Sequence, residues 1–181
     1  MYWRQITSKS RELTSAALGN RRYREKYNPT THTSRENIQR ICQAFLKSNA
    51  NAMVITGKAG TGKSSLVCSL LDQLAPNTAA LLIDCGASAP QVTEGLDRYL
   101  QGIYELSNSF LDTVTPWLEA HPDDTFLLVL DAVNEATERN ALVKAATHFI
   151  HRLPSANFKI LLTSRLPAWA ELSKAFAVGT P

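Results

Sequence analysis

Hydrophobic and polar positions alternate in a regular order after residue 27. Short apolar runs, hydrophobic on both faces, are separated by stretches in which apolar residues recur at helical spacing. The expected strands lie at 52–57, 79–85, 125–131 and 158–164. The expected helices lie at 36–48, 62–75, 141–150 and from Pro167 onward, with two more between residues 90 and 120. Pro116 falls within the second of these two, where a kink or a boundary is expected.

This alternation predicts an α/β fold of three layers. Strands that are apolar on both faces indicate a buried parallel sheet with helices on both sides. Right-handed crossovers bring the carboxyl ends of all strands to one edge of the sheet, where ligands bind in such folds. Polar residues gather at those ends. They are Gly57–Ser65, Asp84, Asp131–Glu135 and Thr163–Arg165.

Composition indicates one ordered domain. The chain has 181 residues, of which 44% are hydrophobic and 19% charged, enough for one core and too apolar for a disordered chain. Eight Gly and eight Pro are too few for a collagen-like or low-complexity chain. No apolar run approaches the roughly 18 to 20 residues of a membrane helix, so no membrane association is expected.

Positive charge is concentrated at the N-terminus. Residues 1–27 hold seven Lys or Arg and two Glu, a net charge of +5, whereas the rest of the chain carries −2. We interpret 1–27 as a solvated, partly helical basic arm and 28–181 as the core. Its Arg and Ser content leaves a mitochondrial transit peptide open, but its two glutamates make that interpretation the weaker one.

Cysteines and histidines give no sign of a metal site. Cys42, Cys68 and Cys85 lie among apolar residues without a CxxC pair, which predicts reduced core thiols in a cytoplasmic protein. His148 and His151 lie three apart on an expected helix, and without a further ligand nearby they are interpreted as a surface pair.

The segment between the first strand and the next helix carries the most specific motif. GKAGTGKS, residues 57–64, matches the phosphate-binding pattern GxxxxGK followed by Ser or Thr. Backbone N–H groups and the helix N-terminus would surround phosphate, Lys63 would contact the β- and γ-phosphates, and the Ser64 hydroxyl would bind Mg²⁺. The residues expected to contact nucleotide here are Gly57, Lys58, Ala59, Gly60, Thr61, Gly62, Lys63, Ser64 and Ser65.

Two acidic residues follow the third strand. Asp131 ends FLLVLD and, downstream of such a loop, is expected to hold Mg²⁺ through water. Glu135 is a candidate to orient or deprotonate the water that attacks the γ-phosphate. The alternative is that Glu135 stabilises the dipole of the following helix as an N-terminal acid.

The fourth strand ends in Thr163, Ser164 and Arg165. In ATPases of this fold that strand lies between the first and third strands, which would bring Arg165 toward the γ-phosphate. The alternative is a surface arginine at the end of a strand.

GKAGTGKSS, FLLVLDAVNE and KILLTSR, in this order, resemble the STAND class of P-loop NTPases, particularly the NACHT group and its bacterial relatives. The resemblance covers about residues 27–170 and implies the strand order 5-1-4-3-2, with the fifth strand incomplete or absent here. It extends to the small residue Ala132 after the magnesium aspartate and to Arg35-Glu36, an Arg-Glu pair that opens a helix near the nucleotide.

The chain departs from the family pattern in two places. Asn134 stands where NACHT proteins often have a second acid, so either Glu135 or Asn134 would position the water, or hydrolysis would be slow. Only 16 residues follow Arg165, which leaves no room for the helical lid of STAND proteins, although FAVGTP at 176–181 is a candidate start of the fifth strand. We therefore expect a fragment, an excised core or a reduced gene product.

These observations predict an ATP- and Mg²⁺-binding core that hydrolyses ATP as part of a STAND-type signalling switch. Adenine is favoured over guanine because no NKxD-type motif follows the third strand. Partners beyond ATP and ADP stay open between homo-oligomerisation and docking on a larger STAND protein. The alternatives are an AAA+-like DNA-associated ATPase, disfavoured because no nucleic-acid-binding module is evident, and an interaction module that binds nucleotide without hydrolysing it.

Overall fold

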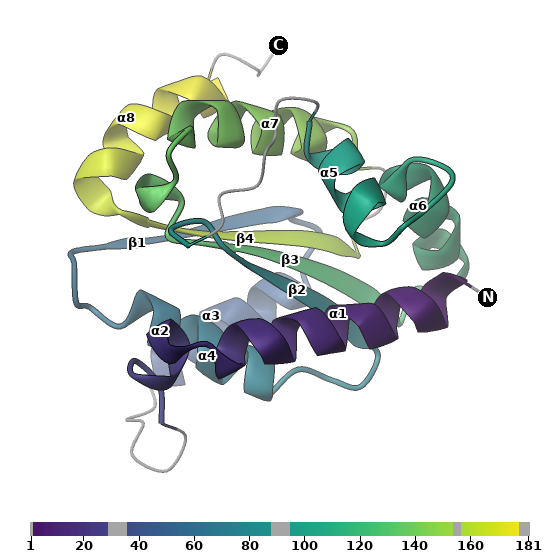
Figure 1. The fold of residues 1–181 in the computed structure, drawn as a ribbon, viewed down its shortest axis with the longest axis horizontal. Helices are drawn as coiled ribbons and strands as arrows, with labels where there is room; N and C mark the ends of the chain where they lie inside the picture. The colour runs from purple at the N-terminus through teal and green to yellow at the C-terminus, as the bar shows by residue number, and fades with distance from the viewer. Residues whose placement is uncertain (1, 29–35, 88–94, 154–156, 178–181) are drawn as a thin grey trace.

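Four parallel strands form one sheet in the computed structural model, which describes residues 2–28, 36–87, 95–153 and 157–177 (Figure 1). The strands are β1 (Ala52–Gly57), β2 (Thr78–Asp84), β3 (Thr125–Asp131) and β4 (Phe158–Arg165). Their spatial order is β1-β4-β3-β2. The predicted α/β class, the parallel sheet and the order of these four strands are confirmed, with strand ends within one residue of the predicted ones.

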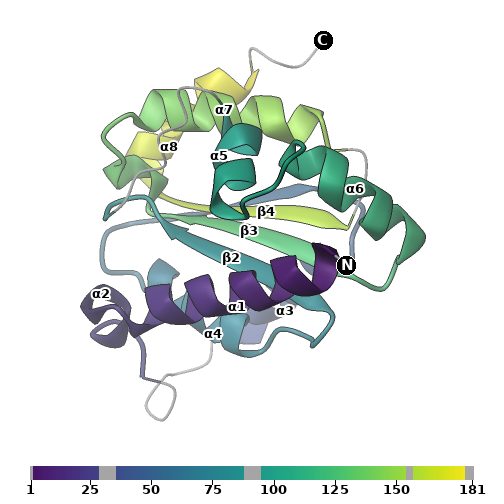
Figure 2. The same ribbon diagram turned by 45° about the vertical axis from the view of Figure 1, so that its right-hand side comes forward.

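Helices lie on both sides of the sheet, which gives three layers (Figures 1 and 2). One side carries α2 (Arg21–Arg24), α3 (Glu36–Leu46) and α4 (Lys63–Asp72). The other carries α5 (Leu96–Ile103), α6 (Phe110–Ala120), α7 (Arg139–His151) and α8 (Leu166–Ala177), together with the short 3₁₀ helix η1 (Val133–Glu135). Within the described ranges, none of these helices has the length and apolar character that crossing a membrane requires.

One expectation about the helices is narrowed and another is wrong. The sequence predicts a kink or a boundary at Pro116, and α6 continues through this residue, which excludes the boundary. Phe176 and Ala177 belong to α8, so the segment from 176 does not begin as a strand, and residues 178–181 lie outside the described part of the chain.

Alternation along the central strands divides the core in two. Phe126, Leu128 and Leu130 of β3 face the α5–α8 layer, whereas Leu127 and Val129 face the layer of α3 and α4. All five are completely buried. Since burying one such side chain contributes about 1.5–3 kcal/mol, the double-sided burial of β3 accounts for the continuous apolar run seen in its sequence. Cys42, Cys68 and Cys85 are buried free thiols, as predicted.

The N-terminal segment is not a solvated arm. Helix α1 (Tyr2–Gly19) runs along the outer edge of β2 (Figures 1 and 2), and Trp3 and Ile6 are buried in the core. The Thr14 side chain bridges the unpaired strand edge: its Oγ1 donates to Ala80 O over 2.7 Å and accepts from Leu82 N over 3.1 Å. This contact covers an edge that would otherwise expose backbone groups. The interpretation of residues 1–27 as a solvated arm was wrong because it was based on the charged residues of the segment and did not consider the residues that α1 buries.

Thr14→Val is therefore expected to lower the free energy of unfolding by about 1–3 kcal/mol, because it leaves two buried backbone groups of β2 without their partner. Urea denaturation measures this. Thr7→Val is the matched control on the same helix, because the Thr7 hydroxyl donates only to Trp3 O of the helix itself. Equal losses for the two variants would contradict the role given to Thr14.

Candidate functional site

The strand register brings the polar residues of the sheet edge together. Gly57 of β1 lies opposite Arg165 of β4, and Asp84 of β2 lies opposite Asp131 of β3. Since β4 separates β1 from β3, the glycine-rich loop, the acidic residues after β3 and the arginine after β4 share one edge. This is the edge at which parallel α/β folds bind their ligands.

The loop between β1 and α4 has a backbone that requires glycine. Gly60 and Gly62 have φ angles of +73° and +77°, in the left-handed region that side-chain-bearing residues avoid. Gly62 is also the N-cap of α4, which begins at Lys63. The loop therefore ends at a helix N-terminus, whose free N–H groups and positive dipole favour an anion.

Lys63 lies against the loop that precedes it. Its Nζ donates to Gly57 O over 3.0 Å and to Lys58 O over 2.9 Å. Partial burial, together with the nearby positive charge of Arg165, lowers the pKa of Lys63. The loop thus surrounds an ammonium group whose present partners are neutral carbonyls.

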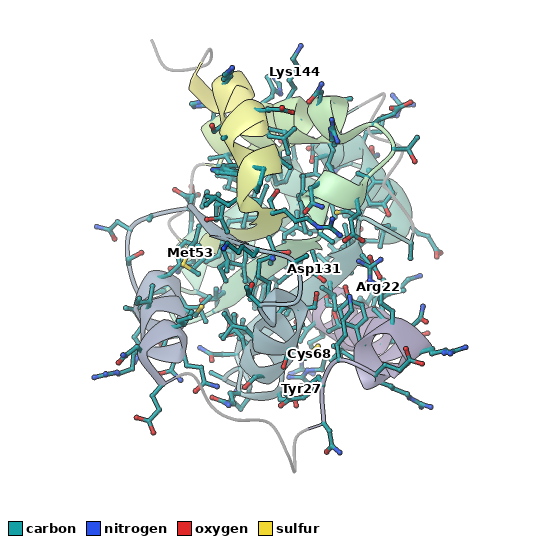
Figure 3. The ribbon with its side chains drawn as sticks, turned by 90° about the vertical axis from the view of Figure 1, so that its left-hand side faces the viewer. Arg22, Tyr27, Met53, Cys68, Asp131 and Lys144 are labelled. Atoms are coloured by element: carbon teal, nitrogen blue, oxygen red, sulfur yellow. The ribbon has the colours of Figure 1, made fainter. Side chains whose placement is uncertain are left out.

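Asp131 is fully buried at the end of β3. Thr163 Oγ1 donates to its Oδ1 over 2.5 Å, and the Tyr23 hydroxyl donates to its Oδ2 over 3.0 Å. Burial and the neighbouring carboxylate of Asp131 raise the pKa of Tyr23, which keeps it a donor. In Figure 3, Asp131 lies near the middle of the molecule, and Arg22 is labelled to its right.

The residue after Asp131 adopts an uncommon conformation. Ala132 has a φ of +58°, and its N–H donates to Thr163 Oγ1 over 2.8 Å. Left-handed backbone at a residue other than glycine costs about 1–2 kcal/mol and often marks a functional site. The turn redirects the chain into η1, so that Glu135 returns toward the sheet edge.

Glu135 is held by two arginines. Arg22 Nη2 donates to its Oε2 over 2.7 Å, and Arg165 Nη2 donates to its Oε1 over 3.1 Å. Partial burial favours the neutral acid, but the hydrogen bonds and charges of Arg22 and Arg165 outweigh it and hold the pKa of Glu135 below its ordinary value. The alternative role as a helix N-terminal acid is wrong, because α7 begins only at Arg139.

Arg22 has a second acidic partner. Its Nε lies 3.2 Å from Asp84 Oδ2, and the Asp84 side chain is only 9% exposed. The other Asp84 oxygen accepts from Gly86 N over 3.0 Å. Arg22 therefore joins the acidic residues that follow two neighbouring strands.

Several of these groups line a cavity of about 290 Å³, whereas Tyr23, Asp84 and Asp131 do not. Its lining consists of Arg22, Lys26, Ala59, Gly60, Thr61, Gly62, Lys63, Ser64, Ser65, Ala132, Asn134, Glu135, Thr163 and Arg165. Gly57 and Lys58 contribute through the carbonyls that contact Lys63, and Asp131 lies behind Thr163. Arg35 lies outside the described residues. Most residues named from the sequence thus surround one cavity.

Three residues of this site have no signal in the sequence. Arg22, Tyr23 and Lys26 come from α2 and the turn after it, in a run that resembles a charged surface. Only the packing of α1 along β2 brings them to the sheet edge. Asn134 is also fixed there, because its Oδ1 accepts from Arg165 N over 2.9 Å.

Comparison with known proteins does not assign the chain to a family. No protein-family model matches the chain, and no curated protein matches it either. Within the described ranges, no cluster of three or more His, Cys, Asp or Glu residues is arranged to hold a metal ion.

Glu135→Gln is expected to destabilise the protein at neutral pH by about 1 kcal/mol, a small value because the Glu135 side chain is 35% exposed. The depressed pKa of Glu135 gives stability above the ordinary glutamate pKa that is lost as the pH falls through the folded-state pKa. The difference between wild type and variant should therefore shrink on acidification.

Urea denaturation across pH measures this difference. Glu119→Gln, exposed on α6, is the matched control and should show no such trend. A wild-type advantage that stays constant into the acid range would contradict the ion pairing of Glu135.

Proposed function

We propose that the chain binds ATP together with Mg²⁺ and hydrolyses it, as the nucleotide-dependent core of a STAND-type, NACHT-like signalling switch. One observation carries the proposal: residues 59–65 of the loop, Glu135 and Arg165 converge on one cavity at the carboxyl edge of a parallel sheet. The sequence resemblance predicts nucleotide chemistry for these residues.

The charges in the cavity suit a polyphosphate. Among the described residues, the cations Lys63, Arg165, Arg22 and Lys26 line the cavity together with one acid, Glu135. The N-terminus of α4 faces the same space through residues 62–65. A chain of phosphates would replace the carbonyls that now accept from Lys63, so that the ammonium group would pair with an anion instead of with neutral acceptors.

In this proposal Ser64 and Asp131 hold a magnesium ion. Ser64 and Asp131 supply a hydroxyl and a carboxylate, the oxygen donors that Mg²⁺ prefers. Asp131 is completely buried and accepts a hydroxyl hydrogen bond on each carboxylate oxygen, so a magnesium-bound water would replace one of these two donors. When bound, the ion would neutralise charge on the phosphates. Ser64 would contact it directly and Asp131 through water, after local movement of Tyr23 or Thr163.

Glu135 has the charge state that a water-activating group needs. Its depressed pKa keeps it ionised at neutral pH, and it lines the cavity beside Asn134. Asn134 accepts from the Arg165 backbone, which couples η1 to the end of β4. In this proposal Glu135 orients and deprotonates the attacking water, Asn134 sets the position of Arg165, and Arg165 contacts the γ-phosphate.

The DNA-associated alternative is weaker in the structure than in the sequence. In that alternative the basic side chains of residues 1–27 contact DNA phosphates, but Lys9, Arg21 and Arg22 are paired with acidic side chains.

The proposal also includes signalling. Exchange of ATP for ADP would change the conformation of the core, and this change would control either homo-oligomerisation or docking on a larger STAND protein.

Titration of a fluorescent ATP analogue with Mg²⁺ tests the proposal. Lys63→Ala should weaken binding about 10- to 100-fold, because it removes charge-assisted hydrogen bonds worth about 1.5–3 kcal/mol. Lys144→Ala is the matched control, since the exposed Lys144 on α7 does not line the cavity. A guanine analogue should bind more weakly than the adenine analogue.

Equal, weak binding of ATP by wild type and Lys63→Ala would contradict the proposed function. Phosphate release is then measured on protein that binds. Binding without release would favour the non-hydrolysing interaction module instead.

A further inference from the structure

Glu135 is held from two directions by residues far apart in the sequence. Arg22 comes from α2, 113 positions before it, and Arg165 comes from the end of β4, 30 positions after it. Both guanidinium groups reach the same carboxylate, one oxygen each. A group that activates water needs a fixed orientation, so which arginine provides it decides how the site works.

The two arginines differ in burial and in partners. The Arg22 side chain is 22% exposed and also pairs with Asp84, whereas the Arg165 side chain is 51% exposed and Glu135 is its acidic partner. A cation between two acids, one of them nearly buried, is costly to displace. Arg165 gives up one exposed ion pair, worth about 0–1 kcal/mol, when a phosphate attracts it.

The surroundings of Arg22 restrict it further. Gly86 packs so closely that a Cβ there would lie 2.8 Å from Glu135 Oε2 and in contact with the Arg22 guanidinium. The neighbouring Tyr23 is 2% exposed and donates to Asp131, which fixes α2 against the sheet. Helix α1 packs along β2 and contacts α2, which follows it directly. The position of Arg22 is thus set by the fold.

We propose that Arg22 is a positioning residue that holds Glu135 in place for ATP hydrolysis, while Arg165 is released from Glu135 to the nucleotide. This inference rests on the proposed function. It makes the N-terminal segment part of the hydrolytic site. The alternative is that Arg22 inhibits the site by keeping Glu135 from reacting. In that case substitution of Arg22 would raise kcat instead of lowering it.

Steady-state ATP hydrolysis and ATP-analogue binding of the full chain distinguish the two. Arg22→Gln should lower kcat at least about tenfold, a part of the 10²–10⁴-fold that a general base contributes, and leave ATP affinity within about twofold. Arg22→Lys should restore part of the rate. Arg21→Ala is the control, because the adjacent Arg21 is 88% exposed and pairs only within α2 and its cap.

Two further measurements separate positioning from general damage. In a Glu135→Gln background, Arg22→Gln should lower kcat no further, because the group it positions is already gone. In the single variant the acid limb of the kcat–pH profile should move to higher pH, since Arg165 and Lys63 are then the charges left near Glu135. If Arg22→Gln does not fold, the double variant Asp84→Asn/Arg22→Gln replaces it, because Asp84 would otherwise be left as a nearly buried carboxylate without its arginine partner.

An unchanged or increased kcat in the Arg22 variants would overturn the inference and leave the proposed function intact. Wild-type protein that binds ATP but releases no phosphate overturns it as well, and leaves nucleotide binding standing. Wild-type protein that does not bind ATP ends both the inference and the proposed function.

Discussion

Acidic side chains at one edge of the sheet are the constraint on which the rest of the structure depends. Asp84 and Asp131 lie opposite each other on neighbouring strands, and Glu135 returns beside them after a left-handed turn at Ala132. Carboxylates in such a place must be neutralised or given donors, because an unpaired buried charge costs several kcal/mol. The donors come from elements far apart in the sequence.

The N-terminal segment supplies the partners that these carboxylates need. Arg22 neutralises two of the acids and Tyr23 donates to the third, and both are carried by a helix pair that also covers the edge of β2. The same contacts that protect the sheet therefore position the groups of the candidate site. In the proposed function, α1 and α2 would therefore couple stability to activity, and a ligand that draws Arg165 away from Glu135 would be felt in this segment.

Local pattern predicts most of this fold, and long-range packing decides the rest. The strands were predictable because β3 and β4 are apolar on both faces, and the loop at 57–64 because its glycines and Lys63 form a contiguous motif. Arg22 and Tyr23 were not, since their partners lie more than 60 positions away. Helix α1 was misread because two of its four buried residues, Ser10 and Thr14, are polar. Thr14 is buried because it forms hydrogen bonds to the edge of β2, and the pattern of hydrophobic residues cannot predict the burial of a polar residue for this reason.

The central claim is that the loop after β1 and the segment around Arg22 form one nucleotide site. Hydrogen–deuterium exchange with and without Mg²⁺-ATP tests it most directly, with α6 as an internal reference away from the cavity. The account predicts slower amide exchange in residues 58–65 together with a changed rate in residues 20–27. The claim would be contradicted if Mg²⁺-ATP left amide exchange unchanged in residues 58–65, in residues 20–27, or in both.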